Sequence, residues 1–194
     1  MGIFAVTRWP GLMPPNFSAA YALVFCAGIY FPRKLLWWLP LSTLLLTDLL
    51  MNHFYYHTAF VSGYMLVNYL AFAALIWLGT KFSAQDSFVK LLSGGLLGAI
   101  LFYFVTNTAA WLQNPEYAKN FPGWIQALTV GTAGWPETWK FFRNTLLSGG
   151  LFTGLFVGIM KLTLAAEPSE REEPETAEAE PASEETKAPG TRRA

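Results

Sequence analysis

The chain has 194 residues, of which 53% are hydrophobic and 13% are charged, and it contains 8 Trp and 16 Phe. Soluble domains carry about 25% charged residues, so this composition excludes an ordinary soluble domain and predicts a membrane protein. The zero net charge hides a segregation, because nine of the 13 acidic residues follow Leu164, whereas the preceding part carries nine Lys and Arg.

Long windows without charge predict an all-α, polytopic bundle of about six transmembrane helices. A spanning helix needs roughly 20 mostly apolar residues, with a range of about 17–25. The fifth segment, FPGWIQALTVGTAGWP, is short, contains three glycines and is bounded by prolines. It therefore predicts a tilted span, a broken helix or a re-entrant segment. The expected helices cover residues 16–31, 35–54, 60–80, 89–112, 122–136 and 141–164.

The C-terminal part differs from this bundle in composition. Residues 165–194 are rich in Glu, Pro, Ala and Thr and contain no aromatic residue. Such a segment cannot bury enough apolar surface to offset the entropy lost on ordering. We therefore predict a transmembrane domain over residues 1–164 and a disordered tail over residues 165–194.

The tryptophans and basic residues lie near the predicted helix ends, as expected for interfacial anchors. With six spans, the positive-inside rule would put both termini outside. The basic residues that flank the odd-numbered connections are Arg33, Lys34, Lys81, Lys90, Lys140 and Arg143.

The stretch LLLTDLLMNHFYYH, residues 44–57, places a carboxylate in an apolar run. An ionisable residue costs about 2.5–3.5 kcal/mol at the centre of a span on insertion scales, so it usually faces the bundle interior and marks function. Asn52 is one helical turn beyond Asp48 and shares its face. We expect this face to anchor a ligand, to form a structural hydrogen-bond hub or to relay a proton or cation.

Amides and one indole on the other predicted helices complete a set of candidate binding residues. Asn side chains carry donors and an acceptor, and in lipid they should face inward. Aromatic walls with a few polar groups are the general composition of a small-molecule pocket, and hydrogen bonds between helices without a ligand are the alternative. The candidate substrate-binding residues are Asp48, Asn52, Asn68, Asn107, Trp111 and Asn144.

His53 and His57 are the metal candidates, because an i, i+4 histidine pair is a spacing that binds metal ions. On a regular helix they lie on a different face from Asp48. The three side chains would therefore converge only through an irregular turn. We predict neither a metal site nor another cofactor.

Small residues recur every four positions on the first predicted helix, at Ser18, Ala22 and Cys26, and also on the fourth and sixth. Such stripes let another helix backbone approach closely. We expect the later stripes to pack within the protein and the first to be a docking surface for a partner subunit.

No other motif indicates chemistry. The Ser93–Gly95 stretch lacks the lysine of a nucleotide-binding loop. The sequence shows no nucleophile elbow and no basic aromatic patch that would indicate nucleic-acid binding. We therefore expect neither enzyme activity nor nucleic-acid binding, and any active transport must use energy from a partner or an ion gradient.

Four stretches together carry a resemblance: PPNFSAAYALVFCAGIYF, LPLSTLLLTDLL, FYFVTNTAAWL and WKFFRNTLLSGGLFTGLF. Over residues 14–157 the chain resembles a family of small bacterial membrane transport proteins, itself similar to the S components of energy-coupling factor transporters. The resemblance implies a six-helix bundle that binds a metabolite or vitamin-like ligand. It also implies docking on a transmembrane coupling protein with ATPase subunits.

The sequence thus predicts a multi-pass protein of the bacterial inner membrane that is the substrate-binding subunit for a small metabolite. Its expected partners are the lipid bilayer, a small ligand and the coupling subunits. The alternative is a membrane scaffold or assembly protein that does not transport.

Overall fold

The computed structural model describes residues 2–58 and 63–166, and within these residues the fold is entirely helical, which confirms the predicted class. Of the predicted disordered tail, Ala165 and Ala166 are the end of the last helix, and the remainder lies outside the described residues. The elements are α1 (Gly2–Arg8), α2 (Ala20–Tyr30), α3 (Trp38–Met51), the π-helical turn η1 (Asn52–Tyr56), α4 (Gly63–Gly79), α5 (Phe88–Gln113), α6 (Phe121–Thr129) and α7 (Thr138–Ala166).

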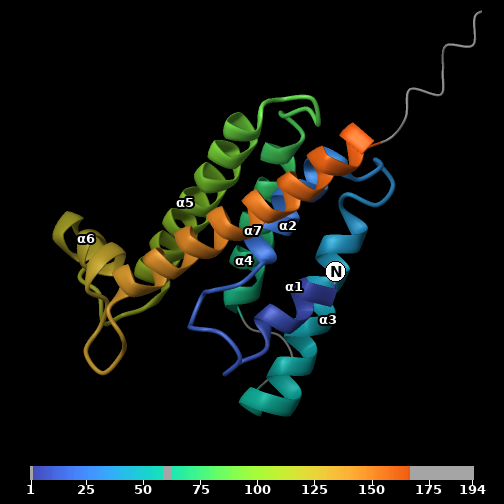
Figure 1. Ribbon diagram of the computed structural model, residues 1–194. Helices are drawn as coiled ribbons and strands as arrows, with labels where there is room; N and C mark the ends of the chain where they lie inside the picture. Colours follow the sequence, from blue (N-terminus) through green and yellow to red (C-terminus); the bar gives the residue numbers. More distant parts are fainter. Residues whose placement is uncertain (1, 59–62, 167–194) are drawn as a thin grey trace, which may run out of the picture.

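Two of these helices, α5 and α7, are long and apolar enough to cross a membrane. The helix α2 has only 11 residues, but seven of them are buried because α4, α5 and α7 surround it (Figure 1). A central helix of this kind makes its apolar contacts with protein instead of solvent or lipid.

The packing of α2 against α4 depends on two glycines. A Cβ atom at Gly28 would lie 2.3 Å from the Ile76 carbonyl oxygen and 2.9 Å from the Gly79 Cα atom. Any side chain at Gly28 would therefore collide with the backbone of α4. The two backbones touch here, as small residues allow in helix pairs.

The long helices α5 and α7 lie side by side and antiparallel (Figure 1). A Cβ atom at Gly95 would lie 2.4 Å from the Thr153 hydroxyl oxygen, and one at Gly149 would lie 3.0 Å from the Ala99 Cβ atom. Near the ends, the rings of Tyr103 and Phe142 have centroids 4.6 Å apart. These glycines therefore pack helices within the protein, as expected for the later stripes.

The direction of α7 shows the path of the chain through the fifth predicted segment. At its start, the Asn144 side chain donates to the Pro15 carbonyl before α2, and near its end Lys161 donates to the Ala84 carbonyl between α4 and α5. The helix α7 thus runs parallel to α2 and begins at the end of the bundle where α5 finishes. The chain between α5 and α7 does not pass to the other end.

Of the three alternatives for residues 122–136, the structure does not support a continuous span. The helix α6 has nine residues, about 14 Å in length, and it projects beyond the ends of α5 and α7 (Figure 1). Gly131 and Gly134 have φ values of +81° and +85°, a left-handed conformation that ends the helix, and Pro136 follows. The glycine-rich half of the segment makes the turn into α7.

The first part of the chain also differs from the prediction. The helix α1 was not expected, and its Phe4 side chain is 0% exposed in a core cluster with residues of α2 and α3. The predicted helix over residues 35–54 begins at Trp38 and ends as α-helix at Met51, followed by η1. The backbone then turns at His57, whose φ is +50°.

Candidate functional site

A cavity with a volume of about 540 Å³ lies at one end of the bundle. We call this the cavity end: it is where α2, α4 and α7 begin and where α3 and α5 finish. The segment before α2, residues 7–18, forms one wall, and α2, η1, α4 and α5 contribute the others. Its polar lining residues include Arg8, Asn16, Ser18, Tyr55, Asn68 and Thr106.

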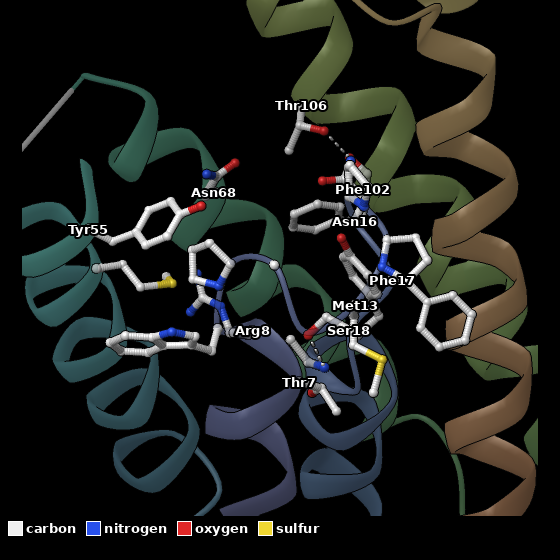
Figure 2. A pocket seen from close by; sticks show the side chains of 18 of the residues that line it. Thr7, Arg8, Met13, Asn16, Phe17, Ser18, Tyr55, Asn68, Phe102 and Thr106 are labelled. Atoms are coloured by element: carbon white, nitrogen blue, oxygen red, sulfur yellow. Dashed lines mark hydrogen bonds between the residues drawn. The ribbon is translucent and has the colours of Figure 1, made fainter.

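The polar groups come from different sides of the cavity. Asn68 and Tyr55 lie on one side, from α4 and η1, and Asn16 and Thr106 lie across from them (Figure 2). Asn16 has φ +61°, a conformation in which Asn is enriched. Arg8 lies below these residues in the view.

The apolar wall of the cavity is aromatic. The Tyr21 ring contacts the Phe102 ring edge-on with centroids 4.9 Å apart, and the centroids of Phe72 and Phe102 are 4.6 Å apart. All three rings line the cavity. Aromatic walls with a few convergent polar groups are what small-molecule sites generally present, so this cavity is the candidate binding site.

Asp48 is the centre of a buried network behind the cavity. It accepts hydrogen bonds from the Arg8 guanidinium and from the Tyr69 hydroxyl, the latter over 2.9 Å. Arg8 also donates to the Thr47 hydroxyl over 2.9 Å. The side chains of Arg8 and Asp48 are 16% and 14% exposed. Asp48 thus joins α1, α3 and α4, and it holds in place the arginine that lines the cavity.

Sequence reasoning missed Arg8 as the partner of Asp48. The sequence did contain an indication of this pair. A carboxylate in an apolar region needs a partner, and Arg8 is the only charged residue before Arg33. Of the predicted roles for Asp48, the structure shows the hydrogen-bond hub directly, with Arg8 between the carboxylate and the cavity.

Two other predicted residues also support the site from behind. The Asn144 side chain donates over 2.9 Å to the carbonyl of Pro15, a residue of the cavity wall, and Asn144 is buried. Asn52 lies at the junction of α3 and η1, and its amide approaches the Met65 sulfur at 3.7 Å. Asn144 therefore fixes the segment before α2, and Asn52 links η1 to α4.

The side chains of Asn107 and Trp111 form their hydrogen bonds outside the lining of the cavity. The Asn107 amide donates to the Tyr103 carbonyl of its own helix, and the Trp111 indole donates to the Ala118 carbonyl in the connection to α6. Neither residue belongs to the described lining of the cavity. Asn68 is thus the one predicted amide that the structure places in the cavity wall.

The histidine pair lies on the exposed turn that follows α3. His53 packs edge-on against Phe54, with ring centroids 4.6 Å apart, and His57 is exposed. The described residues contain no group of three or more His, Cys, Asp and Glu that could hold a metal ion. The irregular turn that such a site would need is present, but it does not gather three ligands among these residues.

The small-residue stripe of the first predicted helix is inside the bundle. Ser18, Ala22 and Cys26 are 8%, 1% and 0% exposed. Ala22 and Cys26 contribute to the packing of the central helix α2, whereas Ser18 precedes this helix and lines the cavity. None of the three presents a docking surface. The expectation of a partner docking on this stripe is corrected accordingly.

Charged groups at the starts of the long helices α5 and α7 form local ion pairs. A hydrogen bond from Lys90, followed by one from the Ser83 backbone, lowers the pKa of Asp86 below its usual value. Hydrogen bonds from Lys140 and Trp139 likewise lower the pKa of Glu137. Asp86 is half-buried and Glu137 is exposed, and neither carboxylate lines the cavity in the described part of the chain.

No curated protein and no solved structure matches the chain. A family model does match it over residues 1–171. This range includes every described element and every residue of the cavity. The chain therefore belongs to DUF6580, a family of unknown function.

Proposed function

We propose that this chain is a multi-pass membrane protein that binds a small metabolite in the cavity, as the substrate-binding subunit of a transport system energised by partner subunits. The observation that carries the proposal is the cavity itself, with aromatic walls and with polar groups from four different elements converging on it. The resemblance to energy-coupling factor S components supports the same function.

The surface of the bundle supports a position within the bilayer. Large apolar side chains are exposed along four helices, which is unusual for a soluble monomer but expected where lipid covers the surface. We propose that α2, α3 with η1, α4, α5 and α7 cross the membrane and that α6 stays at the cavity end. Examples of the exposed residues are Leu46 on α3, Leu70 on α4, Leu101 on α5 and Leu155 on α7.

With five crossings, the first and the last residues of the bundle domain lie on opposite sides of the membrane. We call the end opposite the cavity the basic end, because it carries Arg33, Lys34, Lys81, Lys90 and Lys161. The cavity end carries Lys119, Lys140 and Arg143, besides Arg8, which is paired with Asp48. Under the positive-inside rule the basic end is cytoplasmic, so the cavity faces outward, where an importer meets its substrate.

Cysteine labelling in intact cells tests this topology. A membrane-impermeant maleimide added outside should label the variant Glu116→Cys, at the cavity end, and should leave Gln85→Cys, at the basic end, unlabelled until the cells are opened. The reverse pattern would mean that the orientation is inverted. Equal labelling of both positions would contradict a bundle that crosses the membrane.

A non-transporting scaffold is the less well supported alternative. Such a protein needs exposed surfaces that bind other helices, whereas Gly28, Gly95 and Gly149 are used for packing between its own helices. A scaffold also has no need for a cavity of about 540 Å³ with convergent polar groups.

Two asparagines give a matched test of ligand binding. Protein purified in mild detergent should release a recurrent small molecule on denaturation, detected by mass spectrometry. Asn68→Ala should lower its amount at least fivefold, because one lost hydrogen bond to a ligand costs about 1 kcal/mol or more. Asn107→Ala is the control, since it changes the same amide outside the cavity lining. Equal losses in both variants, or no recurrent molecule, would contradict the proposal.

A further inference from the structure

A second cavity opens between α3 and α4, away from the candidate site. It has a volume of about 370 Å³ and is almost wholly apolar. We call it the Trp groove. Tryptophans at the start of α3 form one end of the groove. Its wall includes Tyr69 of α4, which donates a hydrogen bond from its hydroxyl to Asp48. Its lining residues are Trp37, Trp38, Leu41, Ser42, Leu45 and Tyr69.

Two basic residues precede the tryptophans of the Trp groove by about one helical turn. Residues 33–37 form a turn with helix-like hydrogen bonds that leads into α3, since the amides of Leu36 and Leu39 donate to carbonyls four residues earlier. At this helix-like spacing, Lys34 is one turn before Trp38 and Arg33 is one turn before Trp37, on the same stripes. Arg33 and Lys34 are both exposed. No ion pair to either of them occurs within the described residues.

We propose that the Trp groove is a binding site for an anionic phospholipid, with one acyl chain in the groove and the phosphate on Arg33 and Lys34. The inference relies on the membrane embedding proposed above and not on what the main cavity binds. The groove is apolar along its length and two basic residues precede its tryptophans, and this distribution of charge matches that of the lipid.

The dimensions of the Trp groove favour a lipid chain over a partner helix. From Trp38 to Leu45 the groove follows α3 for roughly 10 Å, which is the upper part of an acyl chain. A helix with its side chains has a diameter of about 10 Å, much wider than an extended hydrocarbon chain. A groove between two neighbouring helices therefore accepts the hydrocarbon chain more readily.

The position of the groove also fits the presence of anionic lipid in the cytoplasmic leaflet of the membrane. Arg33 and Lys34 belong to the basic end, together with Lys81, Lys90 and Lys161. The cytoplasmic leaflet is the one that carries anionic lipid, and basic pockets at helix boundaries bind such headgroups. Tryptophans at the headgroup level are typical of this interface.

Native mass spectrometry of the full chain, titrated with phosphatidylglycerol and separately with phosphatidylethanolamine, tests the proposal. The wild-type protein should retain one phosphatidylglycerol with a preference of about 30-fold over phosphatidylethanolamine, from two basic residues near the surface. The double variant Arg33→Gln/Lys34→Gln should lose this preference. Lys81→Gln/Lys90→Gln removes two charges from the same end and should keep it.

A groove-filling variant tests the acyl-chain part separately. Ser42 is exposed at the groove and bonds only to its own helix, so Ser42→Phe should occupy the space without disturbing the core. It should lose retention of both lipids. The proposal is overturned if Arg33→Gln/Lys34→Gln keeps the preference, if the Lys81→Gln/Lys90→Gln control loses it equally, or if Ser42→Phe retains lipid. Wild-type protein that carries a protein chain on this face instead of lipid would also overturn it.

Discussion

Removal of either member of the Arg8–Asp48 pair should destabilise the protein more than removal of both. Among the described residues, Asp48→Leu leaves the guanidinium with the Thr47 hydroxyl as its side-chain hydrogen-bond acceptor and the Phe4 ring as a further contact, and it removes the acceptor of the Tyr69 hydroxyl. Among the same residues, Arg8→Met leaves the carboxylate with the Tyr69 hydroxyl as its side-chain partner. Each single variant therefore contains an uncompensated charge in a largely buried position.

The magnitude follows from the burial of the pair. Breaking a buried ion pair costs about 3–5 kcal/mol, and the two side chains are 16% and 14% exposed, so we expect about 3 kcal/mol for each single variant. The double variant Arg8→Met/Asp48→Leu leaves no charge at this position. It deprives two neutral hydroxyl groups, those of Thr47 and Tyr69, of one hydrogen bond each, at a cost of about 1 kcal/mol per bond. With two such bonds lost, the coupling free energy should be about 4 kcal/mol.

Equilibrium unfolding in mixed micelles of a mild detergent and dodecyl sulfate, monitored by tryptophan fluorescence, measures these differences. The single variants should unfold at clearly lower dodecyl sulfate fractions than the wild type, and the double variant should recover most of the loss. A double variant destabilised by the sum of the two single effects would refute the reasoning, because it would show that the two charges do not stabilise each other.

Three further outcomes are expected. Gly28→Ala should destabilise the fold by about 2 kcal/mol in the same unfolding assay, because its Cβ would meet the α4 backbone at 2.3 Å, whereas Gly158→Ala, with no atom within 4 Å, should change little. Asn144→Ala should leave the bundle folded but speed proteolysis of the segment before α2, detected by N-terminal sequencing of fragments; unchanged cleavage would contradict its anchoring role. The Asp86–Lys90 pair lowers the pKa of the carboxyl, so its stabilisation should persist at neutral pH and be lost only as the pH falls below 3.8, the unperturbed value. The protection of the amides of residues 80–87 against hydrogen exchange should therefore decrease at acidic pH in the wild type. The variant Asp86→Asn should not show this decrease.

The fold was largely predictable from apolar length, because a helix that is long and free of charge leaves few alternatives in a membrane. The fifth segment shows the limit of this rule. It has the composition of a span, but Gly131 and Gly134 adopt left-handed conformations, and only the backbone path reveals that the chain turns back there. Because α6 stays at the cavity end, α7 runs opposite to the direction that six alternating helices would give it. The five crossings proposed above therefore replace the predicted arrangement of both termini outside.

The candidate site was predictable only in part. Asp48 was recognisable because a buried carboxylate is rare, and Asn68 because an amide in a span faces inward. The partner of Asp48 lies 40 residues earlier, and the residues before α2 that form a cavity wall follow no helical period. Asn107 shows the opposite error, since it satisfies its amide on its own helix. A periodic pattern can identify the inner face of a helix but cannot specify which inward groups meet.

The most direct test of the central claim is the ligand occupancy of a variant in which the cavity is filled. Thr106 and Thr163 both bond to a carbonyl four residues earlier on a long helix, but only Thr106 lines the described cavity. Mass spectrometry of the molecules released from Thr106→Phe should show the bound metabolite reduced at least tenfold, with Thr163→Phe at the wild-type level. Equal amounts in the two variants would show that the cavity is not the binding site.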